Sequence, residues 1–403
     1  MNAQNFDTKP VVKRESKNKI RVDFDRTPLK ERLKAKFLST YFLKNIVLWI
    51  FRLVLMIGIA YIVLNPFLTK IMASMMAPED FGVSSIRLIP KHFSLQLYRY
   101  IVSELGYFNA LKNTFMLSLT VAIIQTFICC LIGYGFAKFK FKGRNLLFAL
   151  VVLTMVIPHQ TISTSMAATF SNFDIFGIVK FLKGGGIELF GYNLKEAIPA
   201  LGNFDVLPDA IRFGEYTRSN GATAYMVNMT INTNGIYLLN TYAPYVILSL
   251  GGLAFKNGLY IFLLRQFFRG VPDELEESAY MDGSGVMKTF FRIILPLSIP
   301  MMITVFLFAF CWQWTDVFYN GLFYRNSEIV FLVSHGTFIP DAVTSLPESI
   351  QMTIDNLKGV AKNDYFTALR NTCSLMLIMP LVILYVFCQK FLVEGIEQSG
   401  LAN

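Results

Sequence analysis

The sequence predicts an all-α integral membrane protein with six transmembrane helices. Its 403 residues are 54% hydrophobic and only 16% charged, and the mean hydropathy is +0.48. This composition is too apolar for a water-soluble globule of this length. Apolar runs of about 20 residues match the length that a helix needs to cross a hydrocarbon core of about 30 Å. Because backbone amides in lipid must be satisfied within their own segment, and no alternating pattern indicates a barrel, we expect these runs to be helical.

Six such runs divide the chain into segments. The predicted spans are residues 46–67, 114–136, 146–166, 245–267, 297–318 and 373–393. The first half comprises a basic cytoplasmic tail (1–45) and spans one to three (46–168), which include an outer loop (68–112). An extracellular insert (169–243) follows. The second half comprises spans four to six (244–395), which include a cytoplasmic loop (271–296) and an outer loop (319–371), and a cytoplasmic C-terminus (396–403). The three outer segments are too long for simple connections, so each is a candidate docking surface.

Basic residues predict which ends of the spans face the cytoplasm. Residues 1–45 contain 12 Lys or Arg against 5 Asp or Glu, and Lys138, Lys140, Lys142 and Arg144 follow the second span. Basic residues near span ends stay on the cytoplasmic side. We therefore expect both termini and the loops after spans two and four to be cytoplasmic. The net charge of +10 then reflects topology and contact with anionic membrane lipids, and we expect no nucleic-acid partner.

The loop after the fourth span is an acidic hairpin with the sequence PDELEESAYMDGSGVMKTFFRIILP. Pro272 suits the first turn of a helix, and the acidic residues that follow it place negative charge at the positive end of that helix. Gly283 and Gly285 then break the helix, and Ser284 is a candidate cap for a second helix that ends where Pro296 redirects the chain. A stiff charged hairpin between two spans predicts a contact for a soluble partner. The alternative is an ordinary amphipathic loop on the membrane surface.

The spacing within this hairpin carries a family resemblance. Glu277, Ser278 and Ala279 are followed after three residues by Gly283, and the segment ends with Ile293, Leu295 and Pro296. This pattern resembles the EAA signature of permease subunits of bacterial ABC importers. The flanking stretches FLLRQFFRGVPDELEESAYMDGSG and IILPLS, together with RLIPKHFSLQLYRYI and NTFMLSLTVAIIQTFICCLIGYGFAKFKFKGR, resemble the carbohydrate-uptake branch, specifically the six-span partner similar to the second maltose permease subunit.

The resemblance implies a fold, partners and roles for particular residues. The fold would be that of a type I ABC importer permease in a bacterial plasma membrane. The partners would be a second permease subunit in a heterodimer, two cytoplasmic ABC ATPase subunits, an extracellular solute-binding protein and a sugar. The residues that carry over to the ATPase coupling role are Glu277, Ser278, Ala279, Asp282, Gly283, Ile293, Leu295 and Pro296. Ser278 departs from the signature, which has alanine there, but is of similar size. The insert at 169–243 is longer than in such permeases and could enlarge the platform for the binding protein.

The chain contains no nucleotide-binding or catalytic motif of its own. It has no GxxxxGK[ST] phosphate loop, and its three histidines, His92, His159 and His335, are far apart in the sequence. We therefore expect no enzyme activity, cofactor or metal in this chain. ATP and magnesium would be used by the partner ATPase.

Four residues are candidates for contact with the transported solute. Lys256 falls in the middle of the fourth predicted span, where a charge is costly unless it faces water or a partner. Trp312, Trp314 and Asp316 lie toward the outer end of the fifth span, and aromatic faces beside a carboxylate commonly bind sugars. The alternatives are a lysine in a structural pair and tryptophans of an interfacial belt.

Three other functions compete with sugar import. A permease for amino acids, polyamines or osmolytes would share the hairpin but should lack the stretch before the second span that resembles the sugar branch. A channel or secondary transporter would work without an ATPase and more often shows internal repeats or several intramembrane charges. A non-transporting scaffold or sensor is a further alternative.

Overall fold

The computed structural model describes residues 40–81, 89–174, 178–183, 188–189, 192–193, 207–217, 223–232, 235–324, 329–334, 338–357 and 359–400. The chain divides into two units, residues 1–67 and residues 68–403. Most of the predicted basic tail and the last three residues lie outside the described residues.

Helix α2 (Thr40–Ser74) contains the first predicted span. Its segment Lys44–Ser74 is long and apolar enough to cross a membrane, and the large apolar side chains before Phe67 are exposed on all sides. A helix that is apolar all round is stable where its surroundings are also apolar, as in a bilayer. The length and composition of α2 therefore agree with the prediction for residues 46–67.

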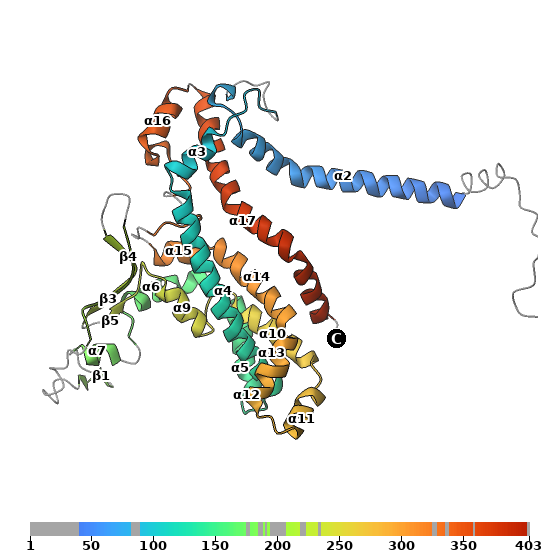
Figure 1. Cartoon of the computed structure of the whole chain (residues 1–403), viewed down its shortest axis with the longest axis vertical. Coiled ribbons are helices and arrows are strands. Elements are labelled where there is room, and N and C mark those ends of the chain that lie inside the picture. Colours follow the sequence, from blue (N-terminus) through green and yellow to red (C-terminus); the bar gives the residue numbers. More distant parts are fainter. Residues whose placement is uncertain are drawn as a thin grey trace, which may run out of the picture. The chain divides into compact units, whose positions relative to one another are not determined.

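Helix α4 (Tyr107–Lys138) lies at the centre of the second unit, where it packs against α9 (Ala243–Leu250), α10 (Asn257–Gly270) and α14 (Ile299–Trp314) (Figure 1). Its buried residues recur every three or four positions, as one face of a helix requires. They include Ala110, Thr114, Leu117, Val121, Gln125, Cys129 and Gly133. A Cβ added at Gly133 would lie 2.9 Å from Leu264 Cβ of α10, so glycine permits this close approach between helices.

One of the predicted spans is bent, and a second bend lies where another predicted span begins. Helix α5 (Arg144–Val156) and the following segment His159–Ser171, which ends in α6 (Ser163–Ser171), make an angle of 95° at a break that contains Pro158. The segments Val286–Leu297 and Ile299–Trp314 make an angle of 74°. The first bend corrects the expectation of a continuous helix over residues 146–166, since Pro158 interrupts it. The second bend lies at the start of the predicted span 297–318, which α14 occupies as one helix as far as Trp314.

The fourth predicted span, residues 245–267, is two helices rather than one. Helix α9 ends at Leu250 and α10 begins at Asn257, and Gly252 and Lys256 between them have φ values of +69° and +66°. Among the described residues, three helices are long and apolar enough to cross a membrane, or up to five if each bent pair is one span. The third of the long helices, α17 (Val360–Gly400), extends the sixth predicted span toward the N-terminus. The six-helix count is therefore not established.

The insert at 169–243 contains β-structure, which corrects the prediction of an all-α fold. Strands β3 (Ala210–Thr217), β4 (Thr223–Asn232) and β5 (Gly235–Tyr237) form an antiparallel sheet in the order β3-β4-β5, with Ala210 opposite Thr230 and Ile231 opposite Ile236. The described part of the insert also contains the short helix α7 (Ile178–Leu182). Strands β1 (Glu188–Leu189) and β2 (Tyr192–Asn193) form a second antiparallel sheet. The glycine run at residues 184–186 and the segment 219–221 of the insert lie outside the described residues.

Short helices occupy the end of the second unit that is opposite α11 (Figure 1). Helix α3 (Gln96–Ser103) is joined to α16 (Glu348–Asp355) by a hydrogen bond of 3.1 Å between the hydroxyls of Tyr100 and Thr353. Buried Asp80, in a 3-10 helix (Pro78–Asp80), accepts the backbone N–H groups of Lys91 and His92 at 2.9 and 2.8 Å. The described parts of the predicted loops 68–112 and 319–371 therefore contain short helices, and a hydrogen bond joins the two loops.

Candidate functional site

The acidic hairpin forms helix α11 (Glu274–Met281), in agreement with the sequence prediction. Asp273 precedes the helix, and the acidic side chains in its first turn are favourable beside the positive helix end. Ala279 is buried, whereas Leu275, Tyr280 and Met281 are exposed, with Met281 at 88%. The exposed part of α11 therefore presents apolar side chains on different sides of the helix, among exposed acidic ones.

Gly283 ends α11 in a Schellman motif. Its φ is +75°, its N–H donates to the carbonyl of Tyr280 at 3.0 Å, and the N–H of Ser284 donates to the carbonyl of Ala279 at 2.9 Å. This left-handed position favours glycine. A Cβ added at Gly283 would have nothing within 4 Å, so the glycine is required here by conformation rather than by close approach within the chain.

Lys138, the last residue of α4, anchors the start of α11. Its ammonium group donates to the carbonyl of Val271 at 2.7 Å and to Oδ1 of Asp273 at 2.5 Å, while its side chain is only 6% exposed. The hydrogen bond from Lys138 lowers the pKa of Asp273 from its ordinary value. The sequence analysis used Lys138 only as one of the basic residues that predict the cytoplasmic side. Its position among other basic residues gave no sign of this contact.

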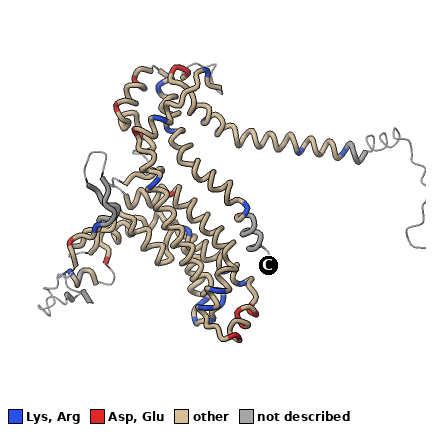
Figure 2. The backbone as a smooth tube through the Cα atoms, viewed as in Figure 1, with Lys and Arg blue, Asp and Glu red and all other residues tan. Residues whose placement is uncertain are grey.

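Glu276 connects α11 to an aromatic cluster. Its Oε1 lies 3.8 Å from the Lys138 nitrogen, and burial raises the pKa of Glu276, partly offset by Lys138. The ring of Tyr134 on α4 lies 5.5 Å from Phe268 of α10 and 4.8 Å from Phe290. The start of α11 therefore lies against a packed aromatic core. Figure 2 shows the acidic residues of α11 beside the basic turn that follows α4.

The predicted coupling residues occupy different environments. Ala279 is buried, Ile293 and Leu295 are half-buried, and the side chains of Glu277, Ser278, Asp282 and Pro296 are exposed. The second helix differs from its prediction. Gly285 rather than Ser284 is its N-cap, and α12 (Val286–Thr289) continues into a π-helical turn (Phe290–Ile294) and α13 (Leu295–Leu297). Pro296 lies inside α13, and the bend follows at Ser298.

Lys256 lies in the break between α9 and α10 and lines a cavity of about 360 Å³, named here the Lys256 cavity. Its Nζ lies 4.7 Å from the ring centroid of Phe255 and 4.7 Å from that of Trp312, a cation–π arrangement with two rings. Trp312 is 45% exposed. The structure therefore brings together two of the four predicted solute-contact residues, Lys256 and Trp312.

His159 is a residue of this site that the sequence interpretation did not place there. It lines the Lys256 cavity, its ring lies 4.8 Å from that of Phe255, and its Nδ1 is hydrogen-bonded to the hydroxyl of Tyr319 at 2.8 Å. The sequence signal that could have indicated this site is Pro158, because a proline interrupts the helix directly before His159. Among the described residues, no group of three or more His, Cys, Asp or Glu could hold a metal ion.

Trp314 and Asp316 lie away from this cavity. Trp314 is 1% exposed and its indole N–H donates to the carbonyl of Leu377 on α17 at 3.0 Å. Asp316 is buried, accepting the backbone N–H of Tyr319 at 3.1 Å and the hydroxyl of Tyr245 at 3.2 Å. Both side chains have structural partners, so packing accounts for them.

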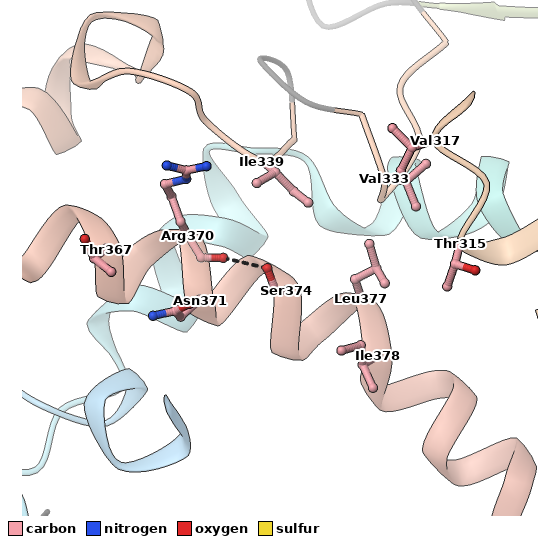
Figure 3. Close-up of a pocket in the computed structure, with 10 residues that line it drawn as sticks. All are labelled: Thr315, Val317, Val333, Ile339, Thr367, Arg370, Asn371, Ser374, Leu377 and Ile378. Carbon is pink, nitrogen blue, oxygen red and sulfur yellow. Dashed lines mark hydrogen bonds between the residues drawn. The ribbon is translucent and has the colours of Figure 1, made fainter. Parts of the chain in front are cut away.

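A second cavity of about 420 Å³, the Arg370 cavity, lies between α17 and the segments after α14 (Figure 3). Helix α17 contributes Arg370, Asn371 and Ser374, and Ser374 Oγ donates to the carbonyl of Arg370 at 3.0 Å (Figure 3). Thr315 and other residues of the facing segments complete the lining. No sequence signal singled out this cavity, because Arg370 lies just before the predicted sixth span.

A helical membrane protein with an exposed charged hairpin at one end and cavities beside its long apolar helices has the organisation of a membrane permease. The chain belongs to the family described as binding-protein-dependent transport system inner membrane component, which matches residues 130–393.

The comparisons with individual proteins agree with this family. The chain is 22% identical over 345 residues to the arabinooligosaccharides transport system permease protein AraQ of Halalkalibacterium halodurans, covering 85% of this chain and 92% of that protein. It is 24% identical over 337 residues to the polygalacturonan/rhamnogalacturonan transport system permease protein YtcP of Bacillus subtilis, covering 83% and 91%. The crystal structure of a bacterial ABC transporter involved in the import of the acidic polysaccharide alginate has a TM-score of 0.56 at 16% identity, over 86% of this chain and 97% of that one, which shows the fold.

Proposed function

We propose that this chain is the permease subunit of an ATP-driven importer that translocates a sugar or oligosaccharide, coupled to its ATPase through α11. Family membership supports transport with a binding protein, and the printed functions of AraQ and YtcP support a saccharide cargo. The observation that carries the coupling is the contact of Lys138 with Asp273 at the start of α11, a helix that leaves Met281 88% exposed.

The coupling residues act as two groups. Glu277, Ser278, Asp282 and Pro296 are exposed and available to a partner, and Gly283 sets the turn. Ala279, Ile293 and Leu295 pack inward, so movement of α11 is passed to the chain segment that becomes α14. Closure of paired ATPase subunits would then tilt the helices that contact α4 and change access to the Lys256 cavity.

The complete importer contains this chain, a second permease subunit, two ABC ATPase subunits and a solute-binding protein. ATP and magnesium are used by the ATPase subunits, and this chain is a transport subunit without enzyme activity. The α11 end faces the cytoplasm together with both termini, in a bacterial plasma membrane. The basic residues around α11 support this orientation through the positive-inside rule (Figure 2).

The Lys256 cavity is the proposed solute contact within this chain. A break in a membrane helix is tolerated where it lines a cavity, and Trp312 presents an exposed aromatic face beside Lys256. Co-expression and affinity purification test the assembly. Recovery of the second permease and the ATPase with this chain supports the importer, whereas a chain purified without either partner under the same mild detergent contradicts it.

A further inference from the structure

The Lys256 cavity and the Arg370 cavity each contain a basic side chain and no acidic one among the residues that line them. Neither Lys256 nor Arg370 forms an ion pair with a carboxylate in the described parts of the chain. The contacts of Lys256 are the rings of Phe255 and Trp312, and the guanidinium of Arg370 lies 5.9 Å from the ring of Phe366. Both cations are therefore available to an anionic ligand.

The backbone places Lys256 in its cavity at a conformational cost. Lys256 is a non-glycine residue with a φ of +66°, a region that side chains other than glycine, asparagine and aspartate adopt rarely. It also lies in the interruption of an apolar segment, where an unpaired charge is unfavourable. If this position had only a structural role, glycine would be more favourable, since it removes both the backbone strain and the unpaired charge. Such strained positions are concentrated at sites that bind ligands.

One short segment lines both cavities. Thr315 and Val317 line the Arg370 cavity, and Phe318 lines the Lys256 cavity. Trp312, three residues before Thr315, packs against Lys256. The connection between α14 and α15 (Phe318–Phe323) is therefore shared by the two cavities that contain the cations.

We propose that the translocated solute is an acidic sugar whose carboxylates pair with Lys256 and Arg370 in turn. The inference rests on the proposed function and adds the substrate class to it. The ammonium of Lys256 binds a carboxylate as a compact charge, while the exposed face of Trp312 stacks on the sugar ring. The guanidinium of Arg370 donates two hydrogen bonds to a second carboxylate in a bidentate pair, with Asn371 and Ser374 beside it for hydroxyl groups.

A competition uptake experiment tests the substrate class with the complete importer in cells. The probes are a mixture of trigalacturonate, its fully methyl-esterified form, alginate-derived trisaccharides and maltotriose, and accumulated sugars are identified by mass spectrometry. We expect the carboxylated trisaccharides to accumulate. Accumulation of only the neutral trisaccharides overturns the inference and leaves the proposed function standing. If no sugar accumulates in cells whose assembled importer is verified, the proposed function fails and the inference with it.

Variants test the two cations by the KM for the accumulated acidic sugar. Lys256→Gln and Arg370→Gln should each raise KM at least about tenfold, because a charge-assisted hydrogen bond is lost. Lys256→Arg should restore part of the loss. Lys362→Gln is the matched control, since Lys362 lies on α17 outside both cavities and pairs with Asp355 at 2.7 Å. If the importer with Lys256→Gln does not assemble, Arg370→Gln alone is used as the test. A wild-type KM in the assembled variants would overturn the proposal.

Discussion

The ammonium group of Lys138 lies 2.5 Å from Oδ1 of Asp273, so the end of α4 is bonded directly to the residue that precedes α11. The same nitrogen donates to the carbonyl of Val271 at 2.7 Å. Because α4 packs against α9, α10 and α14, a force on α11 reaches the centre of the bundle through this contact. The contact gives the coupling hairpin a physical connection to the broken helix that carries Lys256.

Replacing Lys138 should uncouple ATP hydrolysis from transport. Lys138→Met keeps the apolar stem and removes the donors to Val271 and Asp273, so α11 can move without α4. We expect the complex to assemble and the amount of sugar transported per ATP hydrolysed to fall by about tenfold. Lys140→Met, at an exposed lysine two residues later, is the control. An unchanged ratio in Lys138→Met would contradict this role.

Gly283 should tolerate asparagine but not valine. At φ of +75°, a non-glycine side chain costs about 1 to 2 kcal/mol, less for asparagine and more for a β-branched residue. Gly283→Val should therefore prevent ATPase assembly and uptake while membrane insertion persists, and Gly283→Asn should retain most of both. Gly285→Ala is the matched control because Gly285 has φ of −79°. Normal ATPase binding by Gly283→Val would exclude the proposed turn geometry.

Glu276 should make the stability of the α11 region depend on pH. Burial raises its pKa above the ordinary 4.5, so the folded state holds a proton that the unfolded state releases. The wild-type protein should therefore lose stability as pH rises from about 4.5 through the raised pKa, and Glu276→Gln should lack this loss. Asp273 has a lowered pKa and titrates below this window. Melting temperatures of both proteins across pH 4 to 8 provide the measurement, and parallel curves would refute the prediction.

The two neighbouring tryptophans should give opposite phenotypes. Trp314→Phe removes the hydrogen bond to Leu377 from a side chain that is 1% exposed, which should cost about 1 kcal/mol or more and lower the melting temperature with KM unchanged. Trp312→Ala removes a 45% exposed ring that contacts Lys256, so KM should rise while stability changes little. Equal effects of both substitutions on KM would contradict the assignment of Trp312 to solute contact and of Trp314 to packing.

The insert can be removed at a defined base. Phe173 and Ile236 exchange both backbone hydrogen bonds at 2.9 Å, the geometry of the closing pair of a two-residue hairpin. Replacing residues 174–235 with Asn-Gly should leave the permease assembled with its ATPase. We expect weaker docking of the solute-binding protein, measured as a higher Kd by surface binding to the purified complex. An unchanged Kd would show that the insert is not the docking platform.

The sequence pattern predicted the parts of the fold that depend on local chemistry. The apolar run of α4 and the acidic hairpin were predicted because composition, glycine and proline positions determine them. The break before Lys256 was missed because an average over an apolar run hides an interruption, although Gly251 and Gly252 were visible in it. The alternation in β4 was similarly overlooked within a segment assumed to be irregular.

The contacts between distant segments could not be predicted from one sequence. Lys138 and Asp273 are 135 positions apart, and nothing in the sequence pairs them. His159 and Lys256 meet only because two interrupted helices place their breaks at the same cavity. Trp312 and Trp314 are two positions apart and therefore point to different sides of α14, which a residue count in a span does not distinguish.

ATP-dependent uptake by the reconstituted importer tests the central claim most directly. The permease pair, the ATPase and the binding protein are placed in proteoliposomes, with ATP enclosed with the ATPase and labelled oligosaccharide on the side of the binding protein. The account predicts accumulation that requires ATP and is lost with Gly283→Val but kept with Gly285→Ala. Accumulation without ATP, or full ATP-driven uptake by assembled Gly283→Val, would contradict coupling through α11.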